Sequence, residues 1–113
     1  MNEYTKEIAD LEQQLESMVE ADEPAKEVAE VEMQLEVLKA IYAAAAALYE
    51  RGRSDRSLRQ GLAIRGYGDW TLDGVYAFVY EAAVELPSAG HHAFLREIAA
   101  TDFERLLLPV PLL

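Results

Sequence analysis

Two stretches of the chain place apolar residues at alternating spacings of three and four. In the first stretch, where polar residues fill most intervening positions, the apolar residues are Tyr4, Ile8, Leu11, Leu15 and Met18. In the second stretch they are Val28, Val31, Leu35, Leu38, Tyr42, Ala45 and Tyr49. This spacing lines the apolar side chains along one side of a helix, as in the seam of a coiled coil. The pattern therefore predicts two helices that pack seam to seam.

The segment 21–24, Ala-Asp-Glu-Pro, separates the two stretches. Proline cannot donate a hydrogen bond inside a helix and fits best in its first turn, so we expect the chain to turn here. Asp22 or Glu23 should then lie near the cap of the second helix. That helix should end near Gly52 and exceed the first in length. We expect its unmatched last turns, residues 43–49, to lie under the C-terminal half of the chain.

A polar linker, Arg-Gly-Arg-Ser-Asp-Arg-Ser, follows at residues 51–57. A glycine stops a helix readily, and a serine or aspartate side chain can accept hydrogen bonds from the first amides of the next helix. The candidates for this cap are Ser54, Asp55 and Ser57. Further along, Gly-Tyr-Gly-Asp at 66–69 predicts a second turn.

Three shorter helices are predicted after the linker, at about 58–65, 72–86 and 88–107. The middle helix, with Thr71 as its cap, is apolar around most of its circumference, so its neighbours should nearly enclose it. We expect Ser88 to cap the last helix. Residues 106–113, Leu-Leu-Leu-Pro-Val-Pro-Leu-Leu, cannot stay helical through two prolines. They are expected to form an extended apolar arm.

The predicted fold is therefore all-α. Residues 1–50 form a long antiparallel coiled-coil-like helical hairpin, and residues 51–113 form a cap of three shorter helices with the C-terminal arm. A length of 113 residues suits one folded unit. Because a two-helix hairpin covers only part of each seam, we expect the hairpins of two copies to associate as a homodimer.

Acidic residues are concentrated in the hairpin. The chain has a net charge of −11, and residues 1–50 carry thirteen acids against three lysines, whereas residues 51–65 carry five arginines against one aspartate. An acidic surface repels phosphate backbones and attracts basic protein surfaces, so direct nucleic-acid binding is not expected. Solubility and adaptation to high salt are two other uses of such acids, and both remain open at this point.

Residues able to carry chemistry are few. The absence of cysteine excludes disulfides, thiolate metal sites and a thiol nucleophile. His91 and His92 point about 100° apart on a helix, and neither belongs to a Glu-x-x-His or His-x-x-x-His pair, so a metal site is not favoured. No Gly-x-Ser-x-Gly elbow and no Walker-type phosphate loop is present. We predict a non-enzymatic protein without cofactor or metal.

The hydropathy pattern also bears on location. No apolar run approaches the roughly 18 residues of a membrane helix, and the first residues lack the basic and apolar regions of a signal peptide. We therefore expect a cytoplasmic protein that makes no membrane contact.

These observations favour a protein that binds a protein partner, as an adaptor, assembly factor or regulator. The candidate contact residues are charged positions on the predicted helices and apolar positions of the arm. They are Glu12, Glu16, Glu20, Glu27, Glu30, Arg53, Arg56, Arg59, Leu108, Val110, Leu112 and Leu113. The arginines could instead pair with hairpin acids, and the arm could fold back on its own core.

Two further hypotheses remain. The first is an acidic inhibitor or immunity-type protein that imitates nucleic acid and blocks a basic nuclease or DNA-binding surface, with binding that collapses in salt. The second is an enzyme or ligand-binding bundle that uses Trp70 and Tyr76 with His91 or His92. A core role for these aromatic residues is favoured over a pocket.

Overall fold

The computed structural model describes the backbone of residues 3–108 and the side chains of residues 6–108, and the regular secondary structure within them is helical. The helices in this part of the chain are α1 (Glu3–Glu20), α2 (Ala25–Gly52), α3 (Arg56–Ile64), α4 (Leu72–Val84), α5 (His91–Ala100) and α6 (Phe103–Leu107). The all-α prediction is thus confirmed.

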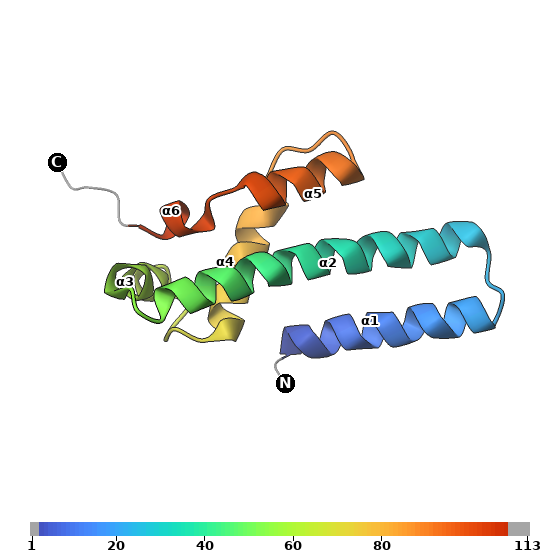
Figure 1. Cartoon of the computed structure of the whole chain (residues 1–113), viewed down its shortest axis with the longest axis horizontal. Coiled ribbons are helices and arrows are strands. Elements are labelled where there is room, and N and C mark those ends of the chain that lie inside the picture. The colour runs from blue at the N-terminus through green and yellow to red at the C-terminus, as the bar shows by residue number, and fades with distance from the viewer. Residues whose placement is uncertain (1–2, 109–113) are drawn as a thin grey trace.

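Helices α1 and α2 form the predicted antiparallel hairpin (Figure 1). Ile8 of α1 packs with Leu35 and Leu38 of α2 in a small cluster, with Leu11 and Leu15 half-buried beside it. All five residues belong to the predicted seams. The arrangement is therefore compatible with coiled-coil packing.

The turn between the two helices differs from the expected one. Asp22 adopts a left-handed backbone conformation with φ 55°. Its amide donates to the Val19 carbonyl at 3.2 Å, and the Glu23 amide donates to the Met18 carbonyl at 3.0 Å. This hydrogen-bond pair closes the end of α1, so Asp22 ends the first helix and does not cap the second. Pro24 itself occupies the N-cap position of α2, without a side-chain cap.

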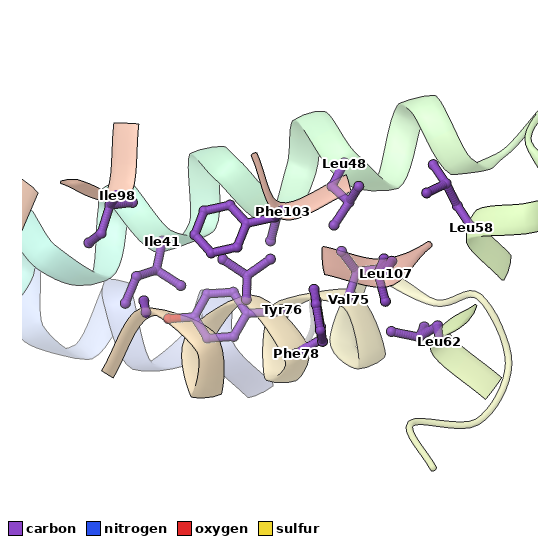
Figure 2. Close-up of a cluster of buried hydrophobic side chains, with 13 residues drawn as sticks. Ile41, Leu48, Leu58, Leu62, Val75, Tyr76, Phe78, Ile98, Phe103 and Leu107 are labelled. Carbon is purple, nitrogen blue, oxygen red and sulfur yellow. The ribbon is translucent and has the colours of Figure 1, made fainter. Parts of the chain in front are cut away.

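The long helix α2 joins the hairpin to the rest of the molecule. Its 28 residues extend about 42 Å, whereas the 18 residues of α1 extend about 27 Å. The surplus is the C-terminal half of α2, where Ile41, Ala45 and Leu48 are buried against α4. Figure 2 shows side chains from α2, α3, α4, α5 and α6 converging here. The expected position of the overhang is confirmed.

Helix α4 is the predicted core helix. Its side chains at five positions are buried, namely Val75, Tyr76, Phe78, Val79 and Ala83. The Thr71 hydroxyl caps the helix by accepting a hydrogen bond from the Gly74 amide at 3.1 Å, as expected. Of the three candidate caps for α3, Asp55 takes the role, because its carboxylate accepts from the Ser57 amide at 2.9 Å.

The predicted helix at 88–107 is wrong in two respects. It begins at His91, because Gly90 takes the N-cap position with φ 132° and Ser88 lies outside the helix. It also breaks after Ala100 into α5 and α6. The break occurs because Thr101 is extended and the Asp102 carboxylate caps α6 by accepting from the amide three residues later. The resulting bend brings Phe103 and Leu107 of α6 into the core.

The start of the predicted extended arm is also wrong, because Leu106 and Leu107 belong to α6. Leu107 is fully buried, and its carbonyl accepts a hydrogen bond from the Arg65 guanidinium at 3.0 Å. A Cβ at Gly61 would lie 2.0 Å from that carbonyl oxygen, so only glycine lets α3 approach this closely. Leu108 is exposed. The candidate residues Val110, Leu112 and Leu113 lie outside the described residues.

The molecule is elongated, with extents of 58 × 33 × 19 Å. Its radius of gyration is 16.2 Å, against about 13 Å expected for a compact domain of this length. Figure 1 shows the reason: α3 to α6 gather around the C-terminal half of α2, and the loop end of the hairpin projects beyond them.

The pair Leu107 and Leu106 tests whether α6 belongs to the core. Leu107→Ala should lower the free energy of unfolding by about 2 to 5 kcal/mol, because it opens a cavity at a fully buried position. Leu106→Ala, at a side chain that is 47% exposed, should cost less than about 1 kcal/mol. Urea unfolding followed by circular dichroism measures both. Equal small losses would show that α6 is not part of the core.

Candidate functional site

The projecting part of the hairpin carries most of the candidate acids. We call residues 12–32 the acidic hairpin end; it holds eight acids and a single cation, Lys26. All five candidate glutamates, Glu12, Glu16, Glu20, Glu27 and Glu30, lie within it and are exposed. The structure thus places the predicted acids together at one end of the molecule.

These glutamates nevertheless divide between two flanks of the hairpin. Glu12 forms an ion pair with Lys39 of α2 at 3.9 Å, which places it and Glu16, one turn further, on one flank. Glu27 and Glu30 precede Gln34 on α2 by about two turns and one turn, and Gln34 lines a groove on the other flank. A single flat partner surface therefore cannot contact all five acids equally.

The acids of the hairpin end have little internal compensation. Among the described residues, Glu12 is the only candidate glutamate with an ion-pair partner. Like charges one turn apart on a helix, such as Glu12 and Glu16 or Glu16 and Glu20, destabilise it by about 0.2 to 0.5 kcal/mol per pair. A bound cationic surface would relieve this repulsion.

The candidate arginines are mostly engaged in the fold. The Arg59 guanidinium donates to the Gly52 and Arg53 carbonyls at 3.1 and 2.7 Å and so closes the end of α2. Arg53 forms an ion pair with Glu50 at 3.3 Å. Of the three candidates, Arg56 alone has no ion pair or side-chain hydrogen bond to another described residue. Arg53 thus pairs with an acid of the hairpin, as the favoured interpretation expected, Arg59 binds backbone carbonyls instead, and Arg56 is left available as a contact residue.

The aromatic residues considered for a ligand pocket are packed into the structure. The Trp70 indole donates to the Tyr49 carbonyl at 3.0 Å and stacks on the Tyr49 ring with centroids 6.4 Å apart. Tyr76 is 1% exposed within the main core. His91 pairs with Glu36 at 2.8 Å, and the described residues contain no group of three His, Asp or Glu side chains placed to hold a metal. Tyr76 thus has the favoured core role, whereas Trp70 is half-buried against the core and also lines a hollow of about 340 Å³ beside the 66–69 turn, together with Arg56 and Arg59.

One tyrosine has a strongly shifted pKa. Burial raises the pKa of Tyr67 to about 12, helped by its hydrogen bond to the Glu81 carboxylate and by nearby negative charge. The hydroxyl donates to Glu81, and the ring packs edge-on against Phe78. These contacts hold the 66–69 turn against α4, which is a structural role.

Sequence reasoning missed an apolar groove on the flank of Glu27 and Glu30. It has a volume of about 320 Å³ and is bounded by α1, α2, α4 and α5. Its apolar lining is Met33, Val37, Leu38, Ile41, Tyr80, Val84 and Phe94. Three of these side chains remain well exposed: Met33 at 44%, Tyr80 at 41% and Val84 at 58%. We call this feature the apolar groove.

A signal for the groove exists in the sequence of α2. Met33, Val37, Ile41, Ala44 and Leu48 form a second apolar stripe, spaced four, four, three and four, beside the hairpin seam. Its C-terminal part is covered by the core, whereas Met33 and Val37 line the groove. The walls from α4 and α5 could not be found from this spacing.

A second hollow, of about 490 Å³, lies where the alanine run of α2 faces α5 and α6. Its floor includes Ala43 and Ala47, and Arg51 pairs with Glu104 at 2.7 Å within its lining. Its lining offers small side chains, and the charges of Arg51 and Glu104 are already paired with each other.

In the described part of the chain, no helix has the length and apolar character needed to cross a membrane. Comparison with protein-family models, with curated proteins and with solved structures gave no match.

Proposed function

We propose that this protein is a non-enzymatic interaction protein, acting as an adaptor, assembly factor or regulator. Its acidic hairpin end binds a basic surface of a protein partner, and the apolar C-terminal arm adds a second contact. The observation that carries the proposal is the exposed, largely unpaired cluster of acids on a segment that projects from the core.

The separation of charge along α2 supports this proposal. Glu27 and Arg51 are 24 residues apart on one helix, which corresponds to about 36 Å. Screening in physiological salt acts over about 8 Å, so the arginines do not neutralise the field of the hairpin end. Arg51 and Arg53 are also paired with Glu104 and Glu50. A cationic partner would therefore meet an unopposed negative surface.

The start of the arm, next to α6, is exposed and can contribute to partner contact. Leu108 is 40% exposed, and Leu106, two residues earlier, is 47% exposed. Exposed apolar side chains that gather in this way favour contact with another protein. The candidate residues Val110, Leu112 and Leu113 extend this apolar sequence.

The proposal includes a homodimer. Leu15, Met18 and Val28 of the hairpin seam are only half-buried, and a second hairpin alongside would cover them as a four-helix bundle. The acids oppose this association electrostatically, whereas burial of the seam favours it.

A second candidate function is charge mimicry by an inhibitor or immunity-type protein. The row Glu12, Glu16 and Glu20 favours it, because these exposed carboxylates repeat once per helical turn along one flank. Such a row could occupy a basic nuclease or DNA-binding surface. If nucleic acid displaces this protein from its captured partner, charge mimicry is supported. The partner of an adaptor should not be displaced in this way.

Neutralising the hairpin acids tests the leading proposal. The five candidate glutamates are changed together to glutamine, which preserves length and helix propensity while removing charge. The wild-type chain, used as bait in its native source, should retain basic proteins that the variant loses. Their retention should fall between about 0.1 and 1 M salt because screening shortens from about 10 to 3 Å. Equal retention by both baits at both salt concentrations contradicts the proposal.

The homodimer is tested by light scattering on the full chain at micromolar concentration. We expect a mass of two chains, with a dimer fraction that rises with salt as the acids are screened. This salt dependence is opposite to that expected for partner binding. A mass of one chain at every salt concentration would show that the seams do not associate.

A further inference from the structure

We propose that the apolar groove is the docking site for a basic amphipathic helix of a partner protein. This inference rests on the proposed function and names the class of partner. The groove differs from the acidic hairpin end in that it offers apolar contact as well as negative charge.

The groove lies where the cover over α2 ends. In the second apolar stripe, Ile41 and Leu48 are buried within the core that α4 helps to form. One and two turns before Ile41, the same stripe continues as Val37 and Met33, and Met33 is 44% exposed. A partner helix packed along α2 at this point would cover Met33 and Val37, as the core covers Ile41 and Leu48 nearer the C-terminus of α2.

The walls of the groove supply anchoring contacts. Tyr80 and Val84 from the C-terminal part of α4 and Phe94 from α5 face the α2 stripe. Tyr80 and Val84 are 41% and 58% exposed, so together with Met33 they make three of the seven exposed large apolar side chains in the described residues. A helix binds such a surface with apolar residues spaced i, i+3 or i+4, and i+7.

The charge around the groove selects a basic occupant. Glu7 lines it, and Glu30 and Glu27 continue the same flank of α2 toward the hairpin end. No lysine or arginine belongs to its described lining, and the His91 imidazole is paired with Glu36. Lys26 is the one cation near the hairpin loop. Lysines or arginines beside the apolar face of the bound helix would complement this rim.

The same charge argument disfavours occupants from this chain. Residues 106–113 contain no lysine or arginine, so the arm offers nothing to the acidic rim. A second copy associates through the hairpin seam in the proposed homodimer, and its net charge of −11 disfavours its binding at the acidic rim of the groove. The partner is therefore a different protein with a cationic helical segment.

The test begins with a phage-displayed library of random peptides long enough for about four helical turns, selected against the immobilised full chain. The expected binders carry apolar residues at i, i+3 or i+4, and i+7, with net positive charge. Acidic binders, or binders without helical periodicity, overturn the proposal. Fluorescence anisotropy with one selected peptide then measures affinity.

Two matched lysine variants test the location of the peptide. Val84→Lys places a cation in the groove, at the last residue of α4. Ile64→Lys places a cation outside the groove, at the last residue of α3. Both side chains are exposed, at 58% and 75%, so both variants should fold. Val84→Lys should lower the affinity for the peptide by about tenfold or more, as at a binding hot spot. Ile64→Lys should leave affinity unchanged, and equal affinity of the two variants overturns the proposal.

A second pair tests the charge of the rim. Glu7→Gln removes a charge from the groove and should lower the affinity of the peptide and reduce the salt dependence of binding, whereas Asp73→Asn, in the first turn of α4 and outside the groove lining, should do neither. Displacement of the peptide by a synthetic peptide of residues 104–113 would instead assign the groove to the arm and overturn the proposal.

The groove and the proposed function can fail separately. The triple change of Glu12, Glu16 and Glu20 to glutamine alters the hairpin end without touching the groove lining. If this triple variant loses the basic partners while Val84→Lys leaves the affinity of the selected peptides unchanged, the proposed function is supported and the groove assignment is contradicted. If peptides respond to Val84→Lys and no basic protein is captured, the groove binds such helices but the proposed function falls.

Discussion

The packing of the C-terminal half of α2 against α4 is the contact on which the rest of the structure depends. Ile41, Ala45 and Leu48 are at most 4% exposed, and Val75 and Val79 of α4 are fully buried in the same core. Burial of each larger aliphatic side chain contributes about 1.5 to 3 kcal/mol before entropy is counted. The small side chain of Ala45 leaves room for a neighbouring helix to approach closely.

This contact divides α2 into two parts with different tasks. Its C-terminal half packs against α3 to α6, whereas its N-terminal half pairs mainly with α1, contacts α5 through Glu36 and His91, and carries exposed glutamates. The arginine segment supports the division, because Arg59 closes the end of α2 and Arg65 holds the α6 carbonyl. Positive charge is thereby used inside the fold at one end, while negative charge stays available at the other.

Much of this fold is predictable from the sequence, for specific physical reasons. The seam of Ile8, Leu35 and Leu38 follows from the spacing of apolar residues, and the enclosed position of α4 follows from its apolar circumference. The cap Thr71 follows from its side-chain oxygen, and Asp55 is one of the three caps that the side-chain oxygens of the linker allow. Each of these features is signalled by the spacing or the type of residues within a single helix or at its cap.

The features that could not be predicted depend on contacts between distant segments. Asp102 is a local cap signal at the break after Ala100, but the burial of Phe103 and Leu107 that accompanies the break involves other helices. The apolar groove combines α2 with Tyr80, Val84 and Phe94 from other helices. The candidate acids were found by their charge, but their division between two flanks needed the packing of α1 on α2.

Helix α2 is one continuous helix that joins the buried core to the projecting acidic end. The chain has no cysteine, so spin labels can be placed at Lys26→Cys and Glu50→Cys alone, in protein diluted with unlabelled chain. Pulsed electron paramagnetic resonance should give one narrow distance distribution near about 36 Å, the rise of 24 helical residues. A broad distribution, or a distinctly shorter distance, would show that α2 bends and that the acidic end does not project, contradicting the account.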